Sequence, residues 1–131
     1  MPIEVIRDER RRWLRARASG ILSFDETATF LTTVRDPIEF RMWPLLFDAR
    51  SCSTDMTGAD VDRAVAIVSA TARRQRRAHV AIAADDDQLF QWLLLYETKV
   101  AAAGVPIIRV FRQLPDAERW LDIVSAAREL M

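Results

Sequence analysis

The alternation of apolar and polar residues at the start of the chain predicts a β-hairpin. Ile3 and Val5 alternate with Glu4, and residues 8–10 form a polar turn. In the second run, small or apolar residues alternate with large or charged ones: Leu14, Ala16 and Ala18 against Trp13, Arg15 and Arg17. We expect the first set to face the core. The second set should form a solvated, arginine-rich face with a cation–π contact at Trp13.

A helix should follow the hairpin. Ser23 and Glu26 have the spacing of a capping box, which satisfies unpaired N–H groups at a helix start. Helical spacing then puts four apolar residues on one face: Phe24, Ala28, Leu31 and Val34. Pro37 should end this helix, because the residue before proline avoids the helical region. Residues 38–43 would connect it to the next strand.

Residues 44–68 read as a strand, a polar loop and a second helix. The apolar run 45–47 ends at Asp48 and suits a buried strand. Residues 51–55 are small or polar, which predicts a loop. Thr57 and Asp60 resemble a second capping box. The helix after it carries one apolar stripe: Val61, Ala64, Val65 and Val68.

The same alternation of elements continues to the end of the chain. A strand is expected at 80–83, followed by a helix that Asp85 should cap. Its apolar face would hold Leu89, Trp92, Leu93, Tyr96 and Val100. A last strand at 107–111 precedes a helix that opens at Pro115, with a stripe of Ala117, Trp120, Leu121 and Val124. The order β-β-α-β-α-β-α-β-α predicts a single α/β domain with one mixed sheet and four helices.

Composition narrows the class of protein. A chain of 131 residues, half of them apolar, can bury one core. Its formal net charge of zero argues against a nucleic-acid binder. The single cysteine, Cys52, cannot form an internal disulfide and fits a reducing compartment. No apolar run is long enough to span a bilayer, and the first residues do not resemble a signal peptide. We therefore expect a cytoplasmic protein without an integral membrane segment.

Catalytic chemistry has little support in this sequence. Cys52 and His79 form the one candidate pair of nucleophile and base, and they should lie at opposite ends of parallel strands. His79 is the only histidine, without other ligands at metal-binding spacing. The acidic run 85–87 is better explained by helix capping than by a cation site. We expect no enzyme activity, no cofactor and no metal.

Two surfaces are candidates for binding a partner. The polar segment after the central strand lies at the amino end of a helix, where open α/β sheets usually place their sites. Phe90 and Leu94 add an apolar flank to the third helix. That flank is either a partner or homodimer surface or is buried under a neighbouring helix, and both alternatives stay open.

The order of elements and the polar segment resemble the STAS domain, also called SpoIIAA-like. Family members commonly have a strand that ends in Asp or Asn and then Asp-Ser-Ser/Thr-Gly at a helix start. Here Asp48 ends the strand, and residues 55–58 read Asp-Met-Thr-Gly. Residues 36–48 look like a divergent SpoIIAA-like branch that is grouped with the CRAL-TRIO lipid-binding fold.

The resemblance implies a non-enzymatic signalling or protein-interaction module related to anti-sigma-factor antagonists. In those antagonists the Ser after the Asp is phosphorylated, whereas Met56 occupies that place here. The residues implied for docking or phosphorylation are Asp48, Ser51, Ser53, Asp55, Thr57 and Gly58. The CRAL-TRIO likeness implies an alternative, a carrier of a small apolar ligand or lipid. Its pocket would be lined by Trp43, Trp92 and Phe111. The alternative is that all three are buried core residues, as large aromatic side chains normally are.

Overall fold

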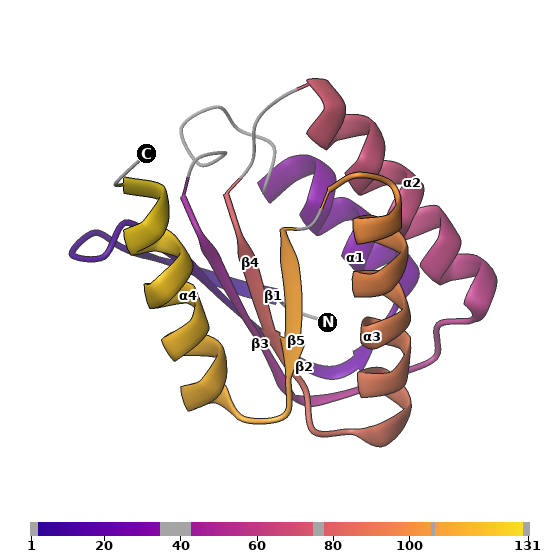
Figure 1. Cartoon of the computed structure of the whole chain (residues 1–131). Coiled ribbons are helices and arrows are strands. Elements are labelled where there is room, and N and C mark those ends of the chain that lie inside the picture. The colour runs from indigo at the N-terminus through magenta and orange to yellow at the C-terminus, as the bar shows by residue number, and fades with distance from the viewer. Residues whose placement is uncertain (1–2, 35–42, 75–77, 106, 130–131) are drawn as a thin grey trace.

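A computed structural model describes residues 3–34, 43–74, 78–105 and 107–129, and it shows a five-stranded sheet with helices on both faces (Figure 1). The strands are β1 (Ile3–Asp8), β2 (Trp13–Leu22), β3 (Leu45–Thr54), β4 (Val80–Ala83) and β5 (Ile108–Phe111). The helices are α1 (Phe24–Thr29), a π-helical segment (Phe30–Val34), α2 (Gly58–Arg74), α3 (Asp87–Ala102) and α4 (Leu114–Glu129). The predicted helix end at Pro37 and the connector 38–42 lie outside the described residues.

The strands are arranged in the sheet in their chain order, β1-β2-β3-β4-β5. β1 is antiparallel to β2, and the other neighbours are parallel. This is the mixed sheet that the sequence predicted. Each parallel step is joined through a helix, as parallel strands require.

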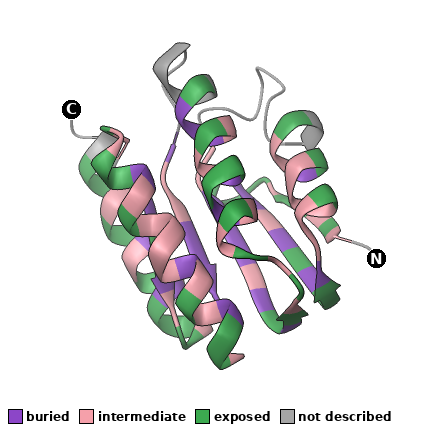
Figure 2. Ribbon diagram, turned by 90° about the vertical axis from the view of Figure 1, so that its right-hand side faces the viewer, coloured by how far each residue is buried: buried purple, intermediate pink, exposed green. Residues whose placement is uncertain are grey.

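The helices divide unequally between the two faces of the sheet. α1, α2 and α3 pack together on one face, and α4 covers the other (Figure 1). Buried positions lie on the strands and on the inner sides of the helices (Figure 2). The larger core includes Leu14, Phe47 and Leu93 beneath the three helices. The smaller core lies beneath α4 and contains Trp13, Leu46, Ala81, Ala83, Ala117 and Leu121.

The strand β3 is longer than the sequence predicted. The polar stretch 51–54 was expected to be a loop, but it continues β3 and pairs with residues 19–22 of β2. The prediction was wrong because it assumed that a strand must be apolar. Residues 51–54 extend beyond the part of the sheet that the helices cover, so they can be polar and are held by backbone pairing with β2. Its inward position, Cys52, is buried.

Two of the three predicted helix caps are confirmed. Ser23 accepts a hydrogen bond from the N–H of Glu26 at 3.3 Å. Thr57 and Asp60 form a reciprocal box, in which each side chain accepts from the backbone N–H of the other, at 3.3 and 3.0 Å. The cap of α3 was predicted one residue early: Asp86, not Asp85, accepts from the N–H of Leu89 at 2.9 Å.

The predicted apolar stripe on the first helix is only partly correct. Phe24, Ala28 and Leu31 are half-buried, whereas Phe30 is buried and its ring meets Phe47 edge to face at 5.3 Å. The segment becomes π-helical from Phe30 onward, so the 3.6-residue spacing assumed for the stripe does not continue beyond that residue.

Trp13 corrects another expectation. It was placed on a solvated face, but its side chain is 2% exposed because α4 lies over it. The cation–π prediction is confirmed, since the guanidinium groups of Arg11 and Arg15 lie 4.7 and 5.4 Å from the centre of its ring.

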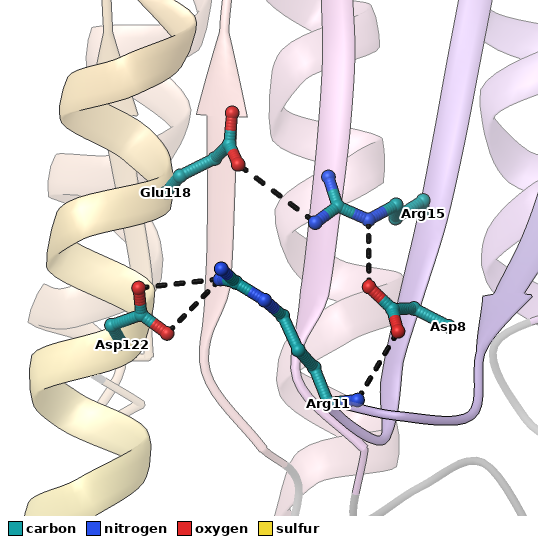
Figure 3. A network of polar contacts seen from close by, with 5 residues as sticks. All are labelled: Asp8, Arg11, Arg15, Glu118 and Asp122. Atoms are coloured by element: carbon teal, nitrogen blue, oxygen red, sulfur yellow. Dashed lines mark hydrogen bonds and ion pairs between the residues drawn. The ribbon is translucent and has the colours of Figure 1, made fainter.

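A polar network that includes these two arginines joins the hairpin to α4 (Figure 3). Arg15 donates to Asp8 at 3.2 Å and lies 3.8 Å from Glu118 of α4. Arg11 lies 3.2 Å from Asp122, one helical turn further along α4. The guanidinium groups thus cover the edge of the smaller core and set the position of α4 over β2.

We expect Trp13→Ala to lower the free energy of unfolding by about 3–5 kcal/mol, because it leaves a cavity between α4 and the sheet. Arg17→Ala on the same strand face is the control, and its exposed side chain should change stability by less than about 0.5 kcal/mol. Urea unfolding followed by far-UV circular dichroism measures both. Equal effects of the two substitutions would show that Trp13 is not a core residue.

Candidate functional site

The predicted docking residues gather at the carboxyl edge of the sheet, where β3 runs into α2. Ser51, Ser53, Asp55 and Thr57 are exposed. Asp48 and Gly58 are half-buried at the two ends of this stretch. We call residues 48–58 the docking corner. Its role in docking remains a prediction.

The docking corner is continuous with a projecting two-stranded ribbon. Residues 19–22 of β2 pair with residues 51–54 of β3. β1 reaches only Ala18 of β2, and β4 reaches only Asp48 of β3. In the described part of the chain, both outer edges of this ribbon therefore lack a neighbouring strand. Ile21, opposite Ser53, is 58% exposed.

Sequence reasoning missed the ribbon because residues 19–22 appeared to end the hairpin. The signal was present in Ile21 and Leu22, two β-favouring residues after Gly20. Gly20 adopts a positive φ of 80°, which glycine tolerates without breaking the strand.

Both threonines of the docking corner have engaged hydroxyl groups. Thr57 accepts the cap hydrogen bond described above. Thr54 donates to the carbonyl oxygen of Leu22 at 2.9 Å and accepts from the N–H of Met56 at 3.0 Å. These bonds fix the turn from β3 into α2 against β2.

Asp48 forms a bidentate ion pair with Arg50. The Nε and Nη2 atoms of Arg50 each lie 2.9 Å from a carboxylate oxygen of Asp48. The hydrogen bonds from Arg50 hold the pKa of Asp48 below its usual range, and the same bonds raise the pKa of Arg50. Asp48 is thus a fixed negative charge and is poorly suited to take up a proton near neutral pH.

The candidate pair of nucleophile and base is far apart. Cys52 lies near the carboxyl end of β3, whereas the carbonyl of His79 binds Leu45 at the opposite edge of the sheet. Cys52 lies seven steps along β3 from Leu45, a distance of roughly 23 Å. Burial, and then the charges of Asp48 and Glu26, raise the pKa of the Cys52 thiol to about 11. His79 instead stacks edge to face on Trp120, with ring centres 5.6 Å apart.

No cluster of three or more His, Cys, Asp or Glu side chains suited to a metal ion occurs among the described residues. Within the same part of the chain, no helix is both long and apolar enough to cross a membrane.

The apolar flank of α3 is half-buried. Phe90 and Leu94 both pack against the larger core. The guanidinium of Arg112 lies 4.0 Å from the centre of the Phe90 ring and pairs with Asp87 at 2.7 Å. The outer face of Phe90 is thus partly covered by a neighbouring loop. Its use as an interface remains a prediction.

An apolar cavity lies between the sheet and the three helices. Its volume is about 90 Å³. Every side chain in its wall is apolar except Thr27 and Tyr96, and the Thr27 hydroxyl donates to the carbonyl of Ser23 at 2.8 Å. The cavity is partly open to solvent, so an apolar occupant would remove apolar surface of its wall from water, which is favourable.

Of the three aromatic residues predicted to line a pocket, only Trp92 does so. Trp43 packs against the larger core outside the cavity wall. Phe111 was placed wrongly, because odd and even positions of β5 face opposite sides. It points towards α4, where its ring centre lies 6.0 Å from that of Trp120.

We expect the Cys52 thiol to react slowly with iodoacetamide at pH 7–8 and faster only as the pH approaches 11, because the raised pKa keeps it protonated below that value. Mass spectrometry of alkylated protein measures the rate, with urea-unfolded chain as the control for a freely accessible thiol. Rapid alkylation of the folded protein at pH 7 would contradict the buried, protonated state.

Comparison with known proteins gives one informative result. No protein-family model matches the chain, and no curated protein matches it. A solved structure does: an uncharacterized protein of the DUF3478 family from Shewanella loihica PV-4, which has a SpoIIAA-like fold. The two are 18% identical over 92% of each chain, with a TM-score of 0.55. The chain therefore has a SpoIIAA-like fold, as the order of its elements predicted.

Proposed function

We propose that this protein is a non-enzymatic, STAS-like module for protein–protein interaction in the cytoplasm, and that its partners bind the docking corner and the β2–β3 ribbon. The observation that carries the proposal is the ribbon, whose two backbone edges are unpaired in the described chain. An unpaired edge can accept a strand from a partner, and β-augmentation of this kind is a common mode of peptide recognition.

The side chains around the ribbon can supply affinity and selectivity. Ile21 is an exposed apolar anchor of the kind that contributes much of the binding energy at interfaces. Arg17 and the ion pair of Asp48 with Arg50 lie on neighbouring strands, where Arg17 and Asp48 are directly opposite. Such charges select a partner more than they strengthen its binding.

We do not expect phosphorylation to act on the docking corner through residue 56 or 57. Met56 has no hydroxyl group, and the Thr57 hydroxyl is used by the cap of α2. A phosphate on Thr57 would lose that cap and would stand beside the carboxylates of Asp55 and Asp60. Ser51 and Ser53 are the exposed hydroxyls that remain for modification.

We expect Ile21→Asp to weaken partner binding by about 30-fold or more, the effect of removing a strong interface anchor. Asp55→Lys should weaken partner binding less than Ile21→Asp, because a charge at the rim of an interface contributes less affinity than an apolar anchor. The matched control is Ile123→Asp, because Ile123 on α4 is equally exposed, at 61%. Affinity capture from native lysate, with each variant compared for the same bound protein, measures the effect. A partner retained by Ile21→Asp, or lost equally with Ile123→Asp, would refute the docking surface.

A second candidate function is the carriage of a small apolar ligand. The cavity of about 90 Å³ with its nearly wholly apolar wall favours it. The two candidate sites adjoin, since Leu22 of the ribbon and Ala49 and Met56 of the docking corner also line the cavity.

We expect Ala64→Leu to fill the cavity, because Ala64 of α2 lines it. The substitution should stabilise the protein by about 1 kcal/mol, as cavity-filling changes commonly do. It should also abolish any small molecule that co-purifies with the wild type in native mass spectrometry. Ala101→Leu, on the exposed side of α3, is the control and should do neither. Destabilisation by Ala64→Leu would show that the wall cannot accept an occupant at that point.

A further inference from the structure

In the described chain, the sheet ends in β1 on one side and in β5 on the other. An end strand presents a row of backbone groups with which a strand of another chain can pair. We propose that Glu97 of α3 closes the β5 edge to any further strand, and that without this carboxylate two copies of the chain would pair through β5. The inference concerns a different edge from the docking corner and stands whether or not partners bind there.

The hydrogen bonds between β4 and β5 show which backbone groups of β5 point outwards. The carbonyl oxygens of Ile107 and Phe111 accept hydrogen bonds from β4 and from the residue after it, at 2.7 and 2.9 Å. Because the backbone groups of successive strand residues point to opposite sides, those of Ile108 and Val110 point away from β4. A strand added to this edge would have to pair with these two residues.

One of these outward-pointing groups is already engaged. The Oε1 atom of Glu97 accepts a hydrogen bond from the backbone N–H of Val110 at 2.7 Å. An antiparallel partner strand pairs with an edge residue by bonding both its N–H and its C=O. While Glu97 holds the N–H, Val110 cannot form such a pair. A strand laid over the carboxylate would also bury its charge without a partner, which costs free energy.

The packing of α3 holds Glu97 beside this strand. Leu93 and Val100, four residues before it and three after it, are its neighbours on the helix surface and are buried in the larger core. Glu97 itself is half-buried, and within the described chain it forms no ion pair. The cation nearest to it in sequence, Lys99, pairs with Asp62 of α2 instead. The carboxylate is therefore committed to the edge of β5.

The two end strands differ in the protection that their own side chains give. β1 carries charges at Glu4, Arg7 and Asp8, and charged residues on an edge strand oppose pairing with another chain. β5 carries one charge, at Arg109, among β-branched and aromatic residues that favour strand pairing. The sequence of β5 thus gives this edge little protection of its own, and Glu97 supplies it from α3.

The test measures self-association of the full chain by sedimentation velocity and by a dilution series of ¹⁵N-labelled protein. We expect Glu97→Ala, which removes the acceptor and suits a helix, to raise the association constant at least about tenfold, because the freed edge gains hydrogen bonds between copies. The concentration-dependent shifts should fall on residues 107–111. Two controls should associate like the wild type: Glu97→Gln keeps an acceptor oxygen, and Glu9→Ala removes the same charge from a side chain that is 70% exposed.

Amide hydrogen exchange gives an independent reading. The Val110 amide should be protected in the wild type, and Glu97→Ala should speed its exchange at least about tenfold in dilute protein, since the hydrogen bond is lost. Free exchange of Val110 in the wild type would overturn the inference by itself. That measurement decides the matter even where Glu97→Ala does not fold.

Three outcomes of the association experiment would contradict the inference. Folded Glu97→Ala that associates no more than the wild type would overturn it. Association with shifts on β1 or on the β2–β3 ribbon, and none on β5, would overturn it as well. Equal association of Glu97→Gln would overturn the assignment to the hydrogen bond with Val110. The docking surface is tested separately, by the Ile21→Asp variant.

Discussion

The parallel pairing of β2 with β3 is the interaction on which the rest of the molecule depends. Each strand has ten residues, and the pair is longer than any other in the sheet. Its first half lies at the centre of the sheet and carries both cores. Its second half projects beyond β1 and β4 as the ribbon. The fold and the candidate docking surface are therefore two parts of one hydrogen-bonded ladder, so changes to one strand reach both.

The two faces of the sheet are packed by different means. Beneath α4, alanines at 81, 83 and 117 bring helix and strands close together, and Trp13 fills the remaining space. Beneath α1, α2 and α3, the helices pack against one another as well as against the sheet. On this side of the sheet a cavity remains, and its wall includes small residues such as Ala49 and Ala64. The sheet thus has one densely packed face and one face on which a cavity remains.

Local patterns predicted the local features of this protein well. The order of elements, the inward face of β2 and the Thr57–Asp60 box depend on neighbouring residues, which the sequence displays directly. Features that need a partner from elsewhere in the chain were missed. The strand at 51–54 exists because β2 lies beside it, and Trp13 is buried because α4 returns over it. The cavity could not be predicted either, because it depends on which side of the sheet Trp92 of α3 and Phe111 of β5 face in the folded chain.

Met56 suggests how the two candidate functions belong together. In the STAS-like motif that the sequence resembles, a Ser occupies this position. Here the same position directs an apolar side chain into a cavity. Filling that cavity is a hydrophobic event and depends little on salt. The surface charges of Arg17, Asp48 and Arg50 are instead screened as ionic strength rises. The proposed ligand binding and the proposed partner choice would therefore respond to different conditions, although both involve residues of one corner of the fold.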